Sequence, residues 1–303
     1  MTGYTLELID LDQQRMGYRQ FISCWVYQAD GLTFIVDPGP CSTSDYLVEA
    51  LRSRGIKKID YILLTHIHLD HAGGTAQVLN AYQNARVYCH EIGVKHIIHP
   101  EKLWQSSIHV LGELAELYGK PASVPAERIA DTKELMARGI QVLPTPGHAP
   151  HHVSFLVDDV LFAGEAMGAR VDMQSNRPYL RPATPPQFFL DSALGSLQKL
   201  LTLSPHPMKI AFAHYGLTSD LVIWCKRAEE QLVRWVDTLR ALYRESPDDL
   251  KERQFSRLMV IDPLFGQGCF DELPEDIRVR ERYFFANTFD GMLGYLQKLS
   301  HSP

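Results

Sequence analysis

Four side chains of metal-binding type crowd into one short stretch of this sequence, Thr65-His66-Ile67-His68-Leu69-Asp70-His71-Ala72-Gly73-Gly74. The stretch begins where Ile59–Thr65, a continuous apolar run with β-branched residues, predicts a buried strand. Residues two apart in an extended backbone point to the same side, so His66 and His68 can converge on one cation. Asp70 and His71 follow in the turn and can face a second cation. Because zinc, iron and manganese accept imidazole and carboxylate ligands, we expect a metal centre at the end of this strand.

Further ligand-type residues occur along the chain, and each follows a predicted strand. His148 comes after the strand-like run 140–144, Glu165 after a hairpin predicted over 152–163, and His214 after the run 208–213. Asp37 ends an earlier predicted hairpin, whose strands at 21–28 and 32–37 flank the turn Ala29-Asp30-Gly31. Functional side chains often lie on loops that leave a rigid sheet. We therefore expect these side chains to meet the histidine cluster.

The order of the predicted elements indicates the fold class. Strand-like runs alternate with helical runs at 42–54, 74–82 and 186–203, and a loop rich in proline and arginine covers 170–186. A helical insertion interrupts this order at about 93–139. Two amphipathic stretches, 219–244 and 275–300, predict a helical C-terminal extension. The order favours an α/β (α+β) sandwich of sheets covered by helices, with a catalytic domain over 1–216 and the extension over 217–303.

Composition narrows the classes of function. The 303 residues include 45% hydrophobic and 22% charged residues, which is ordinary for a globular protein. The formal net charge of −6 does not favour nucleic-acid binding. The first residues lack the basic and apolar regions of a signal peptide, and no apolar run is long enough to span a membrane, so we expect neither. The five cysteines show no CxxC spacing, which favours free thiols in a reducing cytoplasm.

The motif His66-x-His68-x-Asp70-His71 resembles the signature of the metallo-β-lactamase superfamily. Other motifs of that family recur here in the same order, namely Thr145-Pro146-Gly147-His148, Phe162-Ala163-Gly164-Glu165 and Ala213-His214-Tyr215-Gly216. The resemblance covers roughly residues 1–216. It implies the αββα four-layer sandwich, in which two β-sheets pack face to face and helices lie outside them.

The resemblance also implies two divalent metal ions, zinc first, with iron or manganese as alternatives. The implied ligands of the first ion are His66, His68 and His148. The implied ligands of the second ion are Asp70, His71 and His214. Glu165 would lie between both ions, at a position where the family usually has aspartate. Asp37 and His152 would support the ligands from behind through hydrogen bonds.

The segment Thr145-Pro146-Gly147-His148-Ala149-Pro150-His151-His152 is more similar to thioester and lactone hydrolases such as glyoxalase II than to nucleases. We therefore expect a dinuclear-metal-dependent hydrolase that uses a metal-activated hydroxide to cleave an ester, thioester or lactone of a small molecule. Asp70 would orient the water or accept its proton. The insertion and the extension are expected to wall the pocket. Candidate substrate contacts are the aromatic and arginine side chains Trp104, Arg170, Arg177, Tyr179, Arg181 and Tyr215.

Three other functions remain open from the sequence. The same ligands suit a non-haem iron oxidoreductase, although no flavodoxin-like or rhodanese-like domain follows residue 216. A metal-stabilised binding module without turnover is the second alternative. A phosphodiesterase is the third, and it requires a basic groove that the sequence does not reveal. The amphipathic extension can pack on its own domain or on a second subunit of a homodimer.

Overall fold

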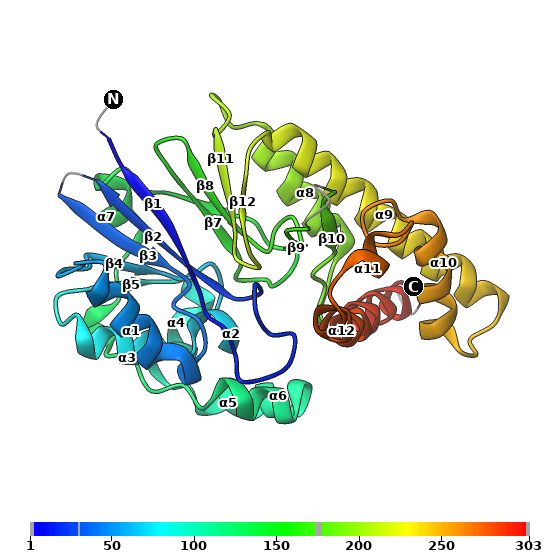
Figure 1. Cartoon of the computed structure of the whole chain (residues 1–303), viewed down its shortest axis with the longest axis horizontal. Coiled ribbons are helices and arrows are strands. Elements are labelled where there is room, and N and C mark those ends of the chain that lie inside the picture. Colours follow the sequence, from blue (N-terminus) through cyan, green and yellow to red (C-terminus); the bar gives the residue numbers. More distant parts are fainter. Residues whose placement is uncertain (1–2, 30, 174–176, 301–303) are drawn as a thin grey trace.

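Two β-sheets packed face to face form the centre of the computed structural model, which describes residues 3–29, 31–173 and 177–300 (Figure 1). Asp30, in the predicted hairpin turn, lies outside the described residues. So do residues 174–176 of the predicted loop. The two sheets and their covering helices confirm the expected αββα sandwich.

The first sheet has the strand order β1-β2-β3-β4-β5. The strand β1, which the sequence analysis did not predict, pairs antiparallel with β2, and β2 pairs antiparallel with β3. The remaining neighbours are parallel. The strands are β1 (Thr5–Asp10), β2 (Ser23–Ala29), β3 (Leu32–Val36), β4 (Tyr61–Leu63) and β5 (Arg86–Tyr88).

The second sheet has the order β12-β11-β8-β7-β6, in which only the β8–β11 pair is parallel among the described strands. Its strands are β6 (Gln141–Pro144), β7 (Val153–Val157), β8 (Val160–Gly164), β11 (Lys209–Phe212) and β12 (Leu217–Thr218). Because β12 pairs with β11, the boundary expected at residue 216 falls inside a hairpin.

The alternation of side chains along each strand explains the four layers. Trp25 and Tyr27 of β2 point into the core between the sheets, where they join Phe155 and Phe162 of the second sheet. Val26, between them in sequence, belongs to a different core beneath the outer helices. Successive side chains of a strand point to opposite faces, so a strand that is apolar on both faces must be covered on both.

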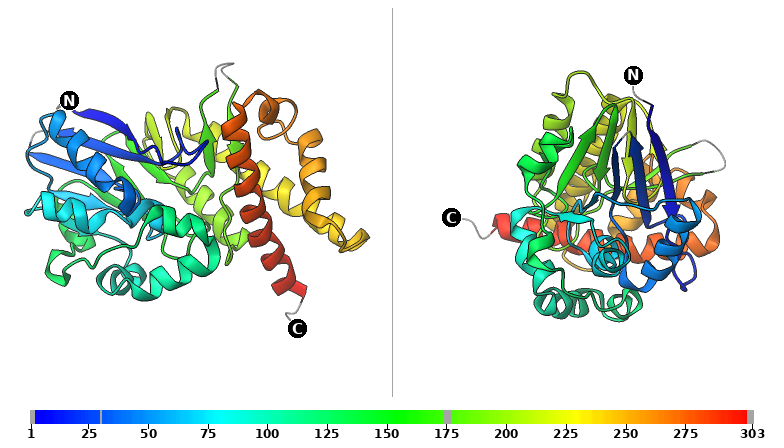
Figure 2. Two further views of the ribbon diagram at one scale, coloured as in Figure 1. Left: turned by 60° about the horizontal axis from the view of Figure 1, so that its bottom comes forward. Right: turned by 90° about the vertical axis from the view of Figure 1, so that its left-hand side faces the viewer.

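Helices cover the outer face of each sheet (Figures 1 and 2). On the first sheet these are α1 (Ser44–Ser53) and α3 (Thr75–Ala81), separated along the chain by the short α2 (Leu69–Ala72). On the second sheet these are α8 (Leu190–Leu201) and α9 (Leu221–Glu245). Each buries one apolar stripe, as amphipathic surface helices do.

Two further groups of helices extend the sandwich. The insertion contains α4 (Glu91–Ile98), α5 (Glu101–Leu111), α6 (Glu113–Tyr118) and α7 (Thr132–Ala137). The C-terminal extension contains α9, α10 (Leu250–Ile261), α11 (Cys269–Glu272) and α12 (Glu275–Ser300). Both α10 and α12 pack against α9. Among the described residues, no helix combines the length and the apolar character that crossing a membrane requires.

The segment 170–186, expected as a loop, departs from that expectation. It contains β10 (Tyr179–Arg181), which pairs antiparallel with β9 (Ala169–Val171). The hydrophobic pattern of each strand spans only three residues, which is too short to produce a periodic signal. Tertiary packing stabilises the pair, because Leu180 also donates its backbone N–H to the carbonyl of Leu264.

Candidate metal centre

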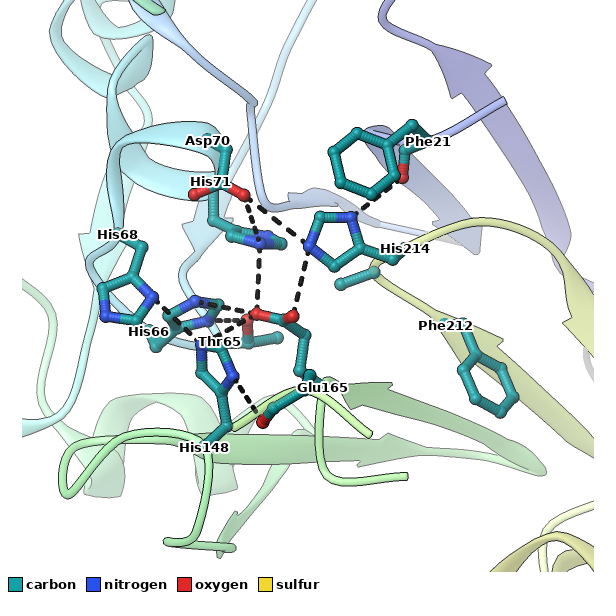
Figure 3. Close-up of polar contacts among 12 residues, drawn as sticks. Phe21, Thr65, His66, His68, Asp70, His71, His148, Glu165, Phe212 and His214 are labelled. Carbon is teal, nitrogen blue, oxygen red and sulfur yellow. Dashed lines mark hydrogen bonds and ion pairs between the residues drawn. The ribbon is translucent and has the colours of Figure 1, made fainter. Parts of the chain in front are cut away.

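The seven predicted ligands converge at one place, although they come from four separate parts of the chain (Figure 3). His66 and His68 follow β4, and α2 supplies Asp70 and His71. The other three follow strands of the second sheet, namely His148 after β6, Glu165 after β8 and His214 after β11. The loops that leave the strands therefore bring together side chains that are up to 148 residues apart (His66 to His214).

Glu165 lies at the centre of the cluster. Its Oε2 atom is 3.2 Å from Nε2 of His66, 2.9 Å from Nε2 of His148 and 3.4 Å from Nε2 of His71. Its Oε1 atom is 3.1 Å from Nε2 of His214. One carboxylate thus faces histidines of both expected metal sites. Its Oε2 atom lies between the first site and His71, and its Oε1 atom faces His214 of the second site. The resemblance implies aspartate at this position, where the chain has the longer glutamate.

Asp70 faces the second group of histidines. Its Oδ2 atom lies 3.4 Å from Nε2 of His71 and 3.6 Å from Nε2 of His214. In the first group, Nε2 of His148 is 2.9 Å from Nδ1 of His68. The side-chain donor atoms form two sets, each with its members within 4.8 Å of one another: His66, His68, His148 and Glu165, and Asp70, His71 and His214.

Hydrogen bonds on the outer side of the rings fix which imidazole nitrogen faces the cluster. Nδ1 of His148 donates to the carbonyl of Ala183 at 3.1 Å, and Nδ1 of His214 donates to the carbonyl of Phe21 at 3.0 Å. A carbonyl only accepts, so both Nδ1 atoms carry the proton. In a neutral ring, Nε2 then presents its lone pair to the cluster. This arrangement is the usual support of histidines that bind metals.

Asp37 performs the same task for two further histidines. Its carboxylate accepts the backbone N–H of Thr65 at 2.8 Å and the Thr65 hydroxyl at 2.7 Å, and it lies 3.2 Å from Nδ1 of His71. Because the hydroxyl proton goes to Asp37, Oγ1 of Thr65 accepts from Nδ1 of His66 at 3.0 Å. Asp37 therefore orients His71 directly and His66 through Thr65, as expected of a supporting residue.

The electrostatics of the cluster favour a cation. Burial and the neighbouring histidines lower the pKa of His66 far below its usual value, and that of His68 to about 3. Burial alone would also lower the pKa of His71, but Asp70, Asp37 and Glu165 outweigh it and raise the pKa well above its usual value. The three carboxylates thus stabilise a positive charge at the position that they surround.

The donor set fits two divalent cations. Nε2 of His66 and Nε2 of His71 are buried and make no hydrogen bond within the described residues. A buried nitrogen without a partner is costly unless something else satisfies it. Five imidazoles and two carboxylates, with lone pairs facing inward, are ligands that zinc, iron and manganese accept. The buried nitrogens without a hydrogen bond and the many acceptor atoms that face one another support the expectation of a metal centre.

A cavity of about 480 Å³ opens over this cluster. Its floor includes His68, Asp70, His148, Glu165 and His214. Its walls come from the insertion (α4 to α6), from the segment 181–187 and from α12. Most of the wall is apolar, and among the described residues Asp70 and Glu165 are the only carboxylates that line it. The volume is typical of a pocket for a small molecule.

The structure places most of the expected substrate contacts elsewhere. Tyr179 is fully buried and donates its hydroxyl to Glu281 at 3.1 Å. Arg170 packs over Trp224 and pairs with Asp172. The other three that do not line the cavity are Trp104, which packs on the first-sheet core, Arg177, which pairs with Glu272, and Tyr215. Arg181 does line it, but its guanidinium is held by Glu281 at 2.9 Å.

Several residues of the cavity wall were not predicted from the sequence. Phe21 stacks on His214 with ring centroids 4.3 Å apart, and it lines the cavity together with Tyr118, Phe284 and Asn287. Two of these lie on α12, far along the chain, and Tyr118 ends a helix of the insertion. No local motif marks them, because their role depends on how separate helices pack.

The sandwich and the cluster together define a protein of the αββα class with a candidate metal centre. Residues 17–214 match the family model described as the metallo-beta-lactamase superfamily. This match covers more than half of the chain, which therefore belongs to that superfamily. The expected family and fold are both confirmed.

Relatives and solved structures agree with this assignment. The metallo-beta-lactamase fold-containing protein ST1585 of Sulfurisphaera tokodaii is 30% identical over 217 residues, which cover 68% of this chain and 77% of the relative. A structure of ST1585, described as from Sulfolobus tokodaii, aligns with a TM-score of 0.65 at 25% identity over 96% of this chain and 98% of that chain. A Thermus thermophilus family member reaches the same TM-score at 21% identity, covering 97% and 94% of the two chains, and shares the fold.

A hydroxyacylglutathione hydrolase of Shewanella baltica is also similar. It is 31% identical over 201 residues, which cover 65% of this chain. The matched region spans 62% of that hydrolase, less than two thirds of its length. The superfamily thus includes hydrolases among the relatives of this chain.

Proposed function

We propose that the protein is a dinuclear-metal-dependent hydrolase that cleaves an ester, thioester or lactone of a small molecule. The observation that carries this proposal is the position of the ligand cluster at the floor of a cavity of about 480 Å³. A purely structural metal site is normally closed by its protein ligands, whereas a catalytic site leaves a position open to substrate.

His66, His68 and His148 would hold one cation, Asp70, His71 and His214 the other, and Glu165 would contact both. Two divalent ions, for which we propose zinc, would supply Lewis acidity and would lower the pKa of a bound water to about 7. Iron or manganese are the alternatives that this ligand set allows.

The residues of the chain prepare the reaction in two ways. Asp70 presents a carboxylate at the cavity floor, where it can accept a hydrogen bond from the attacking water and orient that water. The apolar walls exclude bulk water and hold the acyl part of the substrate. In the net reaction, water cleaves the acyl–oxygen or acyl–sulfur bond. The acyl carbon keeps the oxygen of the water, and the leaving group takes a proton.

Three observations favour an acyl substrate over a phosphodiester. The cavity wall contains few basic groups, and the buried Arg181 among them is already paired with Glu281. The formal net charge of −6 also disfavours a polyanionic ligand. The similarity to a hydroxyacylglutathione hydrolase supports the same choice.

The test combines metal analysis with turnover. The purified protein is chelated, reloaded with zinc, and its metal content is measured by mass spectrometry. Activity is then measured on an ester, a thioester, a lactone and a phosphodiester. We expect about two zinc ions per chain and turnover of at least one acyl substrate. The variant His68→Ala should lose metal and activity, whereas His99→Ala, an exposed histidine beyond α4, should not.

Other results would redirect the assignment. Full metal loading without turnover of any acyl substrate would favour a binding module. Native iron with a visible absorption band would favour oxidoreductase chemistry. A preference for the phosphodiester would contradict the proposed substrate class.

We also propose a cytoplasmic location. All five cysteines are free thiols, and four of them are buried. Disulfides are rare in reducing compartments, so this state fits the cytoplasm. Labelling of the native protein with a thiol reagent, before and after denaturation, measures how many thiols are free.

A further inference from the structure

Tyr118 lies where the insertion reaches the metal centre. It is the last residue of α6, and α6 packs against α2, the short helix that carries Asp70 and His71. The side chain is 1% exposed, and it lines the cavity that opens over the ligand cluster. A residue of the insertion thus lies in the wall beside Asp70.

The hydroxyl of Tyr118 is buried and makes no hydrogen bond to any described residue. Two other buried tyrosines do find partners, since Tyr82 donates to the carbonyl of Ile56 at 3.0 Å and Tyr179 donates to Glu281 at 3.1 Å. A buried donor without an acceptor destabilises a protein, and at Tyr118 the adjoining cavity is a place where a ligand could supply the acceptor.

The surroundings of Tyr118 suit an uncharged phenol that donates. Burial, to which the Asp70 carboxylate adds, raises the pKa of Tyr118 well above its usual value. The nearby cavity wall is apolar and includes Leu111, Leu114 and Phe284. A hydrogen bond formed in such a setting is stronger than one formed in water.

We propose that the Tyr118 phenol donates a hydrogen bond to the carbonyl oxygen of the bound acyl group. This inference rests on the proposed function and names a residue that recognises its substrate. Negative charge develops on that oxygen when water adds to the carbonyl carbon, and a fixed donor stabilises the charge. The bound substrate would supply the acceptor that the protein itself does not provide.

The structure offers a closely matched control in Tyr18. Its hydroxyl is also buried and makes no hydrogen bond to any described residue. Its ring packs in the same core cluster as Tyr118, against Phe21 at a centroid distance of 5.6 Å. Tyr18 does not line the cavity. The variants Tyr118→Phe and Tyr18→Phe therefore remove the same group from similar environments, and only the first alters the cavity wall.

The test measures catalysis, binding and stability for both variants. For the zinc-loaded protein, kcat and KM are determined on the acyl substrate that gives turnover, and hexanoate, a carboxylate of the product type, is titrated by calorimetry. We expect Tyr118→Phe to lower kcat/KM about tenfold to a hundredfold, mainly through kcat, and to weaken hexanoate binding. Its melting temperature should stay unchanged or rise. Tyr18→Phe should leave kcat/KM and hexanoate binding within about twofold.

The outcomes separate this inference from the proposed function. Unchanged kinetics and unchanged hexanoate binding in Tyr118→Phe would overturn the inference and leave the hydrolase assignment intact. Equal losses in both tyrosine variants would also overturn it, because they would indicate a packing effect. If no acyl substrate is hydrolysed but hexanoate binds and loses affinity only in Tyr118→Phe, the donor role stands and the hydrolase assignment fails. If wild-type protein neither hydrolyses acyl substrates nor binds hexanoate, both are overturned.

Discussion

The Nε2 atom of His152 accepts the backbone N–H of Glu165 at 3.0 Å. On the other side of the ring, Nδ1 lies 3.0 Å from the carbonyl oxygen of Thr145, to which it donates. The ring is neutral, because burial and the neighbouring His148 lower the pKa of His152 to about 3. His152 therefore fixes the backbone that carries the central carboxylate, although it contributes no ligand atom itself.

Replacing His152 should weaken metal binding without removing a ligand. In His152→Ala the N–H of Glu165 loses its acceptor, and the carboxylate loses its fixed position. We expect metal affinity to fall about tenfold to a hundredfold, as is typical for supporting residues. Competition with a fluorescent chelator measures this change. His152→Gln, whose side-chain oxygen can still accept the N–H, should retain more affinity than His152→Ala. Equal affinity in wild type and His152→Ala would contradict the supporting role.

A side chain at position 164 should displace His152. Gly164 has φ +58, and an added Cβ would lie 2.3 Å from Nε2 of His152. Gly164→Ala should therefore lower both the melting temperature and the metal content. Gly195→Ala is the matched control, because Gly195 is exposed within α8 and an added Cβ meets nothing within 4 Å. The control should raise stability by up to about 1 kcal/mol. Full metal loading in Gly164→Ala would show that the close approach to His152 is not required.

A buried ion network should govern stability in acid. Burial alone would raise the pKa of Glu281, but Arg181 and Arg280, each 2.9 Å away, outweigh it and hold the pKa at about 2. A lowered folded-state pKa contributes stability that is fully present above the unfolded value of 4.5 and is lost as pH falls toward about 2. This contribution is on the order of 3 kcal/mol at neutral pH.

The variant Glu281→Gln should show this dependence directly. At pH 7 it leaves two buried arginines without their carboxylate, so we expect a loss of about 3–5 kcal/mol in the free energy of unfolding. The difference from wild type should shrink as the pH falls from 4.5 to 2 in urea unfolding experiments. Asp276→Asn removes the partly exposed pair with Arg19 and should cost about 1 kcal/mol or less at pH 7. A constant difference between wild type and Glu281→Gln across that pH range would contradict the assignment.

The ligand types and the strand–loop pattern of the site could be read from the sequence. His66, His68, Asp70 and His71 lie close together in the chain, and their neighbours in sequence remain their neighbours in space. The apolar runs before each ligand predicted most strands, because burial on both faces leaves a continuous hydrophobic signal. Three-residue strands such as β9 and β10 leave no such signal, and the sequence analysis placed them in a loop.

The residues that form the cavity wall could not be predicted from the local sequence. Arg170 and Tyr179 have side chains of the right chemistry, but the direction in which a side chain points depends on which elements pack beside it. Tyr179 turns to Glu281 of α12, a residue 102 positions away. Tyr118 was not singled out, since a tyrosine at the end of a short helix has no local mark that distinguishes a wall residue from a core residue.

The sequence by itself determined which side chains are of metal-binding type and that they follow strands, because ligand chemistry and hydrophobic periodicity are local properties of the chain. Only the tertiary structure decided that Glu165 faces both histidine groups, that His152 holds its backbone, and that α6 and α12 line the cavity. The physical reason is that these relationships join residues distant in sequence. Their geometry follows from how sheets and helices pack, and no short segment encodes it.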